Sequence, residues 1–277
     1  MPFNPISSVG SSNSVATSAA MLNTKQRPIP RDYLVEVSKG NVDGSSIVCK
    51  FGSNPDIQNA ITYEDIWDGG STTDWAPPTI ARLHNLVSTD VADDVGGAGA
   101  EIVEVQGLDS AYALQTENVD LNGTSNVATA NTYTMIHRMR VMQSNNGAND
   151  TYNVGNITAT AQTDGTITAQ ISVGNNQTLM AIYQIPASKT GYLAKFWGTL
   201  SGKSSANVSL RLWTKGDNEP WQLKETVEIS GSASSIIQVD HRLMASYGAK
   251  TIIKMDASSD TNSTGVGAGF DLLLVDN

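Results

Sequence analysis

Between residues 100 and 141 the chain alternates apolar and polar side chains in three short runs. The apolar positions share one parity within each run: Val103 and Val105, then Val119 and Leu121, then His137, Met139 and Val141. The polar positions lie between or beside them: Glu104, Gln106, Asn118, Asp120, Arg138 and Arg140. A period of two is the spacing of a strand with one buried face, so this stretch predicts antiparallel strands whose charges point outward.

Similar runs occur along the rest of the chain. They are DYLVEVSKG (32–40), SSIVCKFG (45–52), YLAKFWGTL (192–200), ANVSLRLW (206–213), EPWQLKETVEI (219–229), KTIIKM (250–255) and GFDLLLVD (269–276). The stretch NITATAQTDGTITAQISV (156–173) predicts a β-hairpin, because Asp164-Gly165 favours a two-residue type I′ turn. No long helical pattern interrupts these runs.

The strand pattern predicts an all-β fold with two β-sandwich or jelly-roll-like domains. Residues 1–32 show no hydrophobic period and contain four prolines, so they predict an extended N-terminal arm. The sequence GNNQ (174–177) breaks the strand pattern. We therefore expect a first domain over residues 33–175 and a second over residues 176–277.

Composition narrows the functional classes. The chain has 17 basic and 27 acidic residues, a net charge of −10, which argues against direct binding of nucleic acid or an anionic membrane surface. Charged residues make up 16%, which is low for a free soluble enzyme and suits a protein held in an assembly.

Cys49 is the single cysteine of the chain, which excludes a disulfide framework. Its position in an apolar strand predicts a buried, inert thiol. The N-terminus lacks a signal-peptide pattern.

No set of residues predicts catalysis. His84, His137 and His241 lie outside any nucleophile motif, and His137 shares the parity of the apolar residues of its strand. Paired acidic residues could support glycosidic cleavage, but their spacing in the sequence does not show that any two converge, and an outward acidic rim is favoured. Calcium remains a minor alternative at two loops, formed by Asp90, Asp93 and Asp94 or by Asp256 and Asp260. We expect no catalytic, cofactor-binding or metal-binding residues, and no cofactor.

A few aromatic and charged residues are candidates for contacts with partner proteins. Trp67, Asp68 and Trp75 surround a Gly- and Pro-rich loop and could form a contact surface, although tryptophans of this kind more often fill a core. His137 favours a packed or interface position. The predicted partner-contact set is Trp67, Asp68, Trp75, His137, Arg138 and Arg140.

Several motifs recur together in one order. They are KFGSNPDI (50–57), EDIWDGG (64–70), EVQGLDSAYALQTENVDLNGT (104–124), IHRMRV (136–141), MAIYQIPASKTGYLAKFW (180–197), SLRLW (209–213) and FDLLLVD (270–276). This series resembles a family of tailed-phage virion structural proteins that is widespread in marine phages. The resemblance covers about residues 33–277 and leaves out the arm. It implies a particle component without enzymatic activity, and it supplies no catalytic residues.

The sequence therefore predicts a non-enzymatic structural protein of a bacteriophage virion, assembled in the host bacterial cytoplasm. We expect it on the head surface, as a decoration or cement protein, or at the head–tail junction. Expected partners are the major capsid protein or portal and neck proteins, and further copies of the chain, with a trimer favoured by analogy. The alternative is a receptor- or glycan-binding module of a fibre or tail. A polysaccharide-degrading enzyme is the least favoured reading.

Overall fold

The computed structural model describes residues 32–59, 62–69, 74–145, 151–201, 205–231 and 236–277. The chain divides into two compact units, residues 1–43 and residues 44–277. The predicted arm, residues 1–32, lies outside the described residues except for Asp32.

In the described part of the first unit, the structure contains the short helix α2 (Tyr33–Ser38), where the sequence predicted a strand. Asp32 caps this helix, since its carboxylate accepts hydrogen bonds from the N–H groups of Leu34 (2.9 Å) and Val35 (3.4 Å). Gly40 follows the helix with φ +74°. An N-cap carboxylate satisfies amides that a helix leaves free in its first turn. This local stabilisation outweighs the alternation of residues 32–40, and the strand prediction there was wrong.

The second unit is built from antiparallel sheets, which confirms the predicted all-β fold. One sheet has the order β1 (Ser45–Ile57), β16 (Thr264–Asp276), β11 (Lys189–Ser201), β14 (Ile236–Tyr247). Another has the order β10 (Ile182–Gln184), β15 (Ile252–Ser259), β12 (Asn207–Lys215), β13 (Gln222–Ser230), and β2 (Glu64–Asp65) also pairs with β15.

The remaining strands form two further sheets. One has the order β6 (Val127–Ala128), β3 (His84–Ser88), β8 (Ile157–Ala161), β9 (Ile167–Ile171). The other places β4 (Ala100–Leu108) between β5 (Leu114–Asp120) and β7 (Met135–Ser144). On β4, Val103 and Val105 are fully buried while Glu104 and Gln106 are partly exposed, as the alternation predicted.

The predicted hairpin over residues 156–173 is present as β8 and β9, but its turn differs. Residues 162–166 connect the strands, and φ is positive at Thr163 and Gly165. A type I′ turn at Asp164-Gly165 would need positive φ at both central residues, so the two-residue turn was wrong. The Asp164 carboxylate instead accepts hydrogen bonds from Arg82 (3.1 Å) and the Thr79 N–H (3.1 Å), which hold the longer loop.

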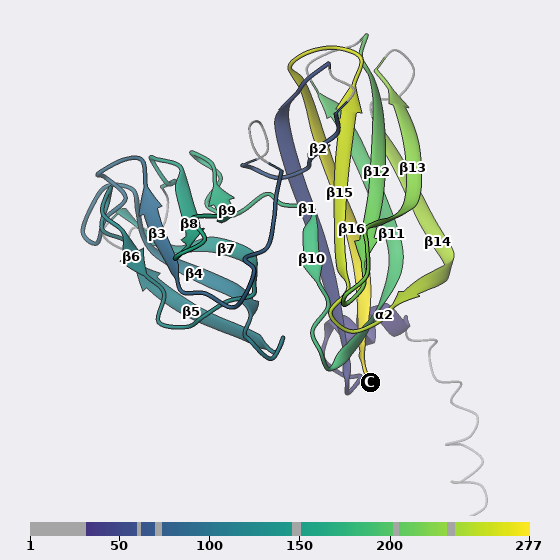
Figure 1. Cartoon of the computed structure of the whole chain (residues 1–277), viewed down its shortest axis with the longest axis horizontal. Helices are drawn as coiled ribbons and strands as arrows, with labels where there is room; N and C mark the ends of the chain where they lie inside the picture. Colours follow the sequence, from purple (N-terminus) through teal and green to yellow (C-terminus); the bar gives the residue numbers. More distant parts are fainter. Residues whose placement is uncertain (1–31, 60–61, 70–73, 146–150, 202–204, 232–235) are drawn as a thin grey trace, which may run out of the picture. The chain divides into compact units, whose positions relative to one another are not determined.

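Strand β1 pairs with β16 along nearly its whole length, so the first and last strands of this unit lie side by side (purple and yellow in Figure 1). The pairing links residues of the first expected domain (33–175) to the sheet formed by strands of the second (176–277). The division at residues 175 and 176 stays a prediction.

Two hydrophobic cores stabilise the unit. The first is built from β1, β10, β11, β12, β15 and β16 and includes Phe196, Leu210, Leu212, Met255 and Phe270. The second joins β3, β4, β7, β8 and β9 to residues from outside those strands, including Trp67, Met180, Ile182 and Ile252. Full burial of one such side chain contributes roughly 1.5–3 kcal/mol, so these cores hold the sheets against the entropy of the unfolded chain.

Which face of β1 turns inward depends on Gly52. A Cβ atom at this position would lie 2.4 Å from the Ala181 nitrogen and 2.4 Å from the Ile66 carbonyl oxygen, so only glycine fits. Lys50 and Asn54 share this parity and are buried, whereas Cys49 is exposed. The expectation of a buried Cys49 was wrong, because the backbone contact at Gly52 assigns Cys49 to the outer face.

Candidate functional site

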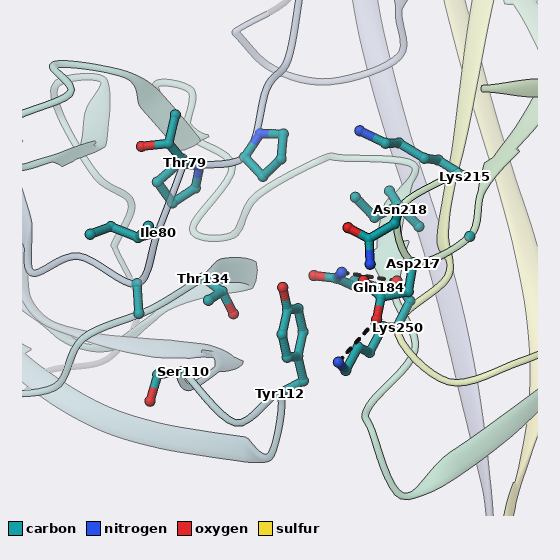
Figure 2. Close-up of a pocket in the computed structure, with 15 residues that line it drawn as sticks. Thr79, Ile80, Ser110, Tyr112, Thr134, Gln184, Lys215, Asp217, Asn218 and Lys250 are labelled. Carbon is teal, nitrogen blue, oxygen red and sulfur yellow. Dashed lines mark hydrogen bonds and ion pairs between the residues drawn. The ribbon is translucent and has the colours of Figure 1, made fainter. Parts of the chain in front are cut away.

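Turns at the ends of several strands enclose a pocket of about 690 Å³, which we call the loop pocket. Its lining comes from the β4–β5, β12–β13 and β14–β15 turns and from residues 77–81, and includes Ser110, Tyr112, Lys215, Asp217, Asn218 and Lys250 (Figure 2). Loops held by a rigid sheet scaffold are where binding residues most often lie. The loop pocket is therefore one candidate site.

Three residues that line the loop pocket have left-handed backbone conformations. The φ angle is +60° at Tyr112, +60° at Asn218 and +63° at Lys250. Asparagine tolerates this region, but for Tyr and Lys it costs on the order of 1 kcal/mol each. Such strain persists only where the surrounding structure holds it, and it is common at ligand sites.

The side chains of the loop pocket combine an aromatic face with both charges. The Lys250 ammonium lies 3.0 Å from a carboxylate oxygen of Asp217 and 4.9 Å from the centre of the Tyr112 ring. Figure 2 shows the Tyr112 ring standing beside Lys250, with Thr134 on its other side. An aromatic face with a few convergent polar groups suits a polar, hydroxyl-rich small molecule.

A second pocket, of about 460 Å³, is lined by residues of β1, β5 and β7, and we call it the Lys50 pocket. It has amide and hydroxyl groups from Gln106, Gln115, Thr116, Gln177 and Thr178, and apolar groups from Val48, Phe51, Leu114, Tyr183 and Leu274. Its charged lining residues are Lys50 and Arg138, and no acidic residue is among the described residues that line it.

Lys50 is almost entirely buried, with 9% of its surface exposed. Its ammonium donates a hydrogen bond of 2.6 Å to the carbonyl oxygen of His137. Burial, together with the positive charge of Arg138, lowers the pKa of Lys50 to about 7. Burial and the nearby charge of Lys50 likewise lower the pKa of His137 to about 3. The His137 ring is therefore neutral at pH 7, while Lys50 is close to the midpoint of its titration.

Among the predicted contact residues, the structure brings His137 and Arg138 together in the Lys50 pocket. The Arg138 guanidinium donates a hydrogen bond of 2.6 Å to the Gln177 side-chain oxygen. Arg140 lies two residues on and forms a two-pronged ion pair with Glu104, with distances of 2.6 Å and 3.3 Å. That contact lowers the pKa of the Glu104 carboxyl.

Trp67 and Trp75 lie in the second hydrophobic core, with 1% and 4% of their surface exposed. The Trp75 indole N–H donates to the Thr168 carbonyl oxygen at 3.0 Å. A Cβ atom on Gly69 would lie 2.4 Å from the Trp67 ring, so the glycine after Asp68 makes room for this indole. The structure thus places both tryptophans as core-filling residues, the alternative that the sequence also allowed.

Asp68 joins the loop after Trp67 to the segment that follows β9. Its carboxylate accepts hydrogen bonds from the N–H groups of Ser172 (3.1 Å) and Leu179 (3.4 Å). Burial nevertheless raises the pKa of Asp68 to about 6. Asp68, Trp67 and Trp75 therefore form no exposed aromatic surface, and a partner-contact role for the six predicted residues stays a prediction.

Two of the acidic residues considered for calcium, Asp93 and Asp256, already accept hydrogen bonds from donors of the protein. Asp93 is fully buried and accepts four hydrogen bonds, from the Ser88 hydroxyl (2.6 Å) and the N–H groups of Ala100 (2.8 Å), Val154 (2.9 Å) and Gly155 (2.8 Å). Asp256 holds Arg211 through two contacts of 2.8 Å and 2.7 Å. In the part of the chain that the structure describes, no group of three His, Cys, Asp or Glu side chains is arranged to hold a metal ion.

Asp93 fastens several loops into one structure, which we call the Asp93 platform, formed by residues 89–99, 151–156 and 172–176. Asn153 adds hydrogen bonds to the carbonyl oxygens of Gly155 (2.8 Å) and Ser172 (2.9 Å). The platform nevertheless exposes apolar side chains: Val91 (72%), Tyr152 (64%), Val173 (57%), Val95 (56%) and Val154 (43%). Apolar side chains held outward on well-bonded loops are typical of a protein contact surface.

Three residues that define these two pockets, Lys50, Tyr112 and Lys250, have no clear functional signal in the sequence. Lys50 lies in an apolar strand, and its local sequence does not show that its face of the strand is the buried one. Tyr112 and Lys250 lie in turns whose left-handed conformation has no reliable signature outside glycine and asparagine.

The described residues include no helix with the length and apolarity needed to span a membrane.

No protein-family model matches the chain, and no curated protein matches its sequence. Among solved structures, the chain is similar to that of the infectious bursal disease virus Gx strain, with 7% identity, a TM-score of 0.25, and coverage of 84% of this chain and 73% of that chain. It is also similar to the infectious bursal disease virus VP2 subviral particle, with 9% identity, a TM-score of 0.22, and coverage of 95% and 78%. At TM-scores this low, the matches carry no argument about this chain.

Proposed function

We propose that the chain is a non-enzymatic structural component of a tailed-phage virion, located on the head surface as a decoration or cement protein or at the head–tail junction. It acts through subunit–subunit contacts with major capsid, portal or neck proteins and with further copies of itself, a trimer by analogy. The order of its sequence motifs and its all-β architecture support this proposal.

The Asp93 platform is the observation that carries the proposal. Its exposed valines and Tyr152 leave apolar surface in contact with water, which is unfavourable for a monomer and favours burial against a partner. The buried hydrogen bonds of Asp93 and Asn153 hold the loops in place before any partner binds, so little ordering entropy is lost on association.

Purified particles of the phage that encodes the chain test the proposal. Mass spectrometry should find the chain in many copies. The double variant Val91→Ser/Tyr152→Ser should be incorporated at least tenfold less than the wild type. Leu223→Ser is the matched control, because Leu223 is 47% exposed on β13, outside the platform. Absence of the chain from particles, or equal incorporation of the platform variant and the control, would reject the proposal.

The loop pocket favours a second candidate, a receptor- or glycan-binding module of a fibre or tail. Its Tyr112 face, the Lys250–Asp217 pair and the Asn218 amide provide the stacking and hydrogen-bonding groups that sugars use. On a glycan array we expect Tyr112→Ala to abolish binding, while Tyr152→Ala, an exposed tyrosine outside the pocket, leaves it unchanged. A blank array, or binding that survives Tyr112→Ala, excludes this candidate.

A further inference from the structure

The Lys50 pocket contains two cationic side chains without a carboxylate partner. Among the ion pairs between described residues, neither Lys50 nor Arg138 takes part, whereas the nearby Arg140 and Lys195 each face a carboxylate. This is unusual in a chain of net charge −10, where acidic residues outnumber basic ones. Neither cation of this pocket is therefore held in a direct ion pair by the described residues.

The two cations also interact unfavourably with each other. The charge of Arg138 is one cause of the lowered pKa of Lys50, and burial is the larger cause. Burial and the charge of Arg140 lower the pKa of Arg138. Glu104 opposes this shift, but its carboxylate is already bound by Arg140. An anion in the pocket would offset both the repulsion between the two cations and the energetic cost of burying Lys50, because charge-assisted hydrogen bonds are strong where water is excluded.

The rest of the lining indicates what kind of anion fits. Val48, Phe51 and Leu114 give the pocket an apolar side with surface still open to solvent, while Gln106, Gln115 and Gln177 add amides that can bind further polar atoms. A volume of about 460 Å³ lies in the range of small-molecule sites. An inorganic ion would leave the apolar side uncovered, whereas an organic acid would cover it.

We propose that the Lys50 pocket binds a small organic carboxylate, whose anionic oxygens are held by Lys50 and Arg138 and whose apolar part contacts Val48, Phe51 and Leu114. Lys50 supplies a compact positive charge at a position from which water is largely excluded. Arg138 supplies a planar fork, already oriented by its hydrogen bond to Gln177, that matches the geometry of a carboxylate. The site does not depend on the virion role proposed above.

Isothermal titration calorimetry of the full-length chain at pH 6.5 and low salt tests this inference with three probes. Hexanoate carries the carboxylate and an apolar chain, acetate carries the carboxylate alone, and inorganic phosphate is the other oxyanion source. We expect hexanoate to bind most tightly. Lys50→Met and Arg138→Gln should each weaken hexanoate binding at least tenfold. Lys195→Met, a lysine of the same sheet that is paired with Asp271, should leave binding unchanged.

Circular dichroism spectra establish that each variant is folded, and Arg138→Gln decides the question if Lys50→Met does not fold. A second readout is the titration of the Lys50 amine by carbon-13 NMR, which should move to higher pH when hexanoate saturates the wild-type chain. Absence of binding by all three probes, tighter binding of phosphate than of hexanoate, binding unaffected by both variants, or an unchanged Lys50 titration would each overturn the inference.

Discussion

Asp93 and Lys50 are both buried ionisable side chains, with 0% and 9% of their surface exposed, but the protein treats them in opposite ways. In the Asp93 platform, one hydroxyl and three backbone N–H groups converge on the carboxylate. In the Lys50 pocket, the ammonium has one carbonyl partner within the described chain, His137, and a neighbouring positive charge.

The difference distinguishes a buried charged side chain with a structural role, Asp93, from one that is available to bind a ligand, Lys50. A buried charge with a full set of hydrogen bonds stabilises the loops that supply them, and its removal leaves those donors unsatisfied. A buried charge with few partners costs stability and retains capacity for a ligand. Sites of this second kind are common where function is maintained at the expense of stability.

Removing the Asp93 carboxylate should have the largest effect. Asp93→Ala leaves the N–H groups of Ala100, Val154 and Gly155 without their acceptor, and we expect the free energy of unfolding to fall by about 3–5 kcal/mol. Urea denaturation measures this change. Asp94→Ala, which removes the partly exposed neighbouring carboxylate, should stay within about 0.5 kcal/mol of the wild type. Equal effects of the two variants would contradict a structural role for the Asp93 network.

Lys50→Met should change stability in the opposite direction. Folding lowers the pKa of Lys50 from its ordinary value of 10.5 to about 7. Between these pH values the unfolded chain binds more protons, so the free energy of unfolding of the wild type should rise with pH from about 7 to about 10.5. Below about pH 7 the full cost of burying the charge is present.

We therefore expect Lys50→Met to be more stable than the wild type by about 2 kcal/mol at pH 7, and to lose this pH dependence. Lys250→Met, at a lysine that is 34% exposed and paired with Asp217, should change stability by less than about 1 kcal/mol. Denaturation curves at pH 7 and pH 10 make the comparison, and a wild type equally stable at both would show that Lys50 keeps its ordinary pKa.

Asp68→Asn should have a smaller effect. Burial raises the pKa of Asp68 from 3.8 to about 6. Between these values the folded chain binds more protons, so stability falls as the pH rises, and at pH 7 the ionised group carries its full burial cost. An asparagine still accepts the Ser172 hydrogen bond without a charge. We expect a gain of about 1 kcal/mol at pH 7, measured against the exposed control Asp120→Asn; a loss of stability would show that the hydrogen bonds require the charge.

Deletion of residues 1–30 should leave the free energy of unfolding of residues 44–277 unchanged. It should weaken incorporation into particles, because the proposed arm contributes contacts with neighbouring subunits. Thermal unfolding and the mass spectrometry of particles measure the two effects separately. A truncated chain that aggregates when expressed alone would assign these residues to the folded core.

The strands of β4, β5 and β7 were predictable because their alternation is local: a period of two requires only that one face be buried, as Val103, Val105 and Met139 are. The helix α2 was missed because a single capping residue, Asp32, stabilises a helix over residues whose alternation predicted a strand.

The candidate sites were largely missed. Each pocket gathers residues from segments far apart in the chain, such as Lys50 and Arg138, or Tyr112 and Lys250.

The sequence by itself determined that the second unit is made of antiparallel strands, because side-chain alternation is a property of each segment alone. Only the tertiary structure decided which face of β1 is buried. That choice depends on the close approach of Ile66 and Ala181 to Gly52, which no local pattern encodes. The same contact turns Lys50 inward and Cys49 outward, since neighbouring residues of a strand point to opposite faces.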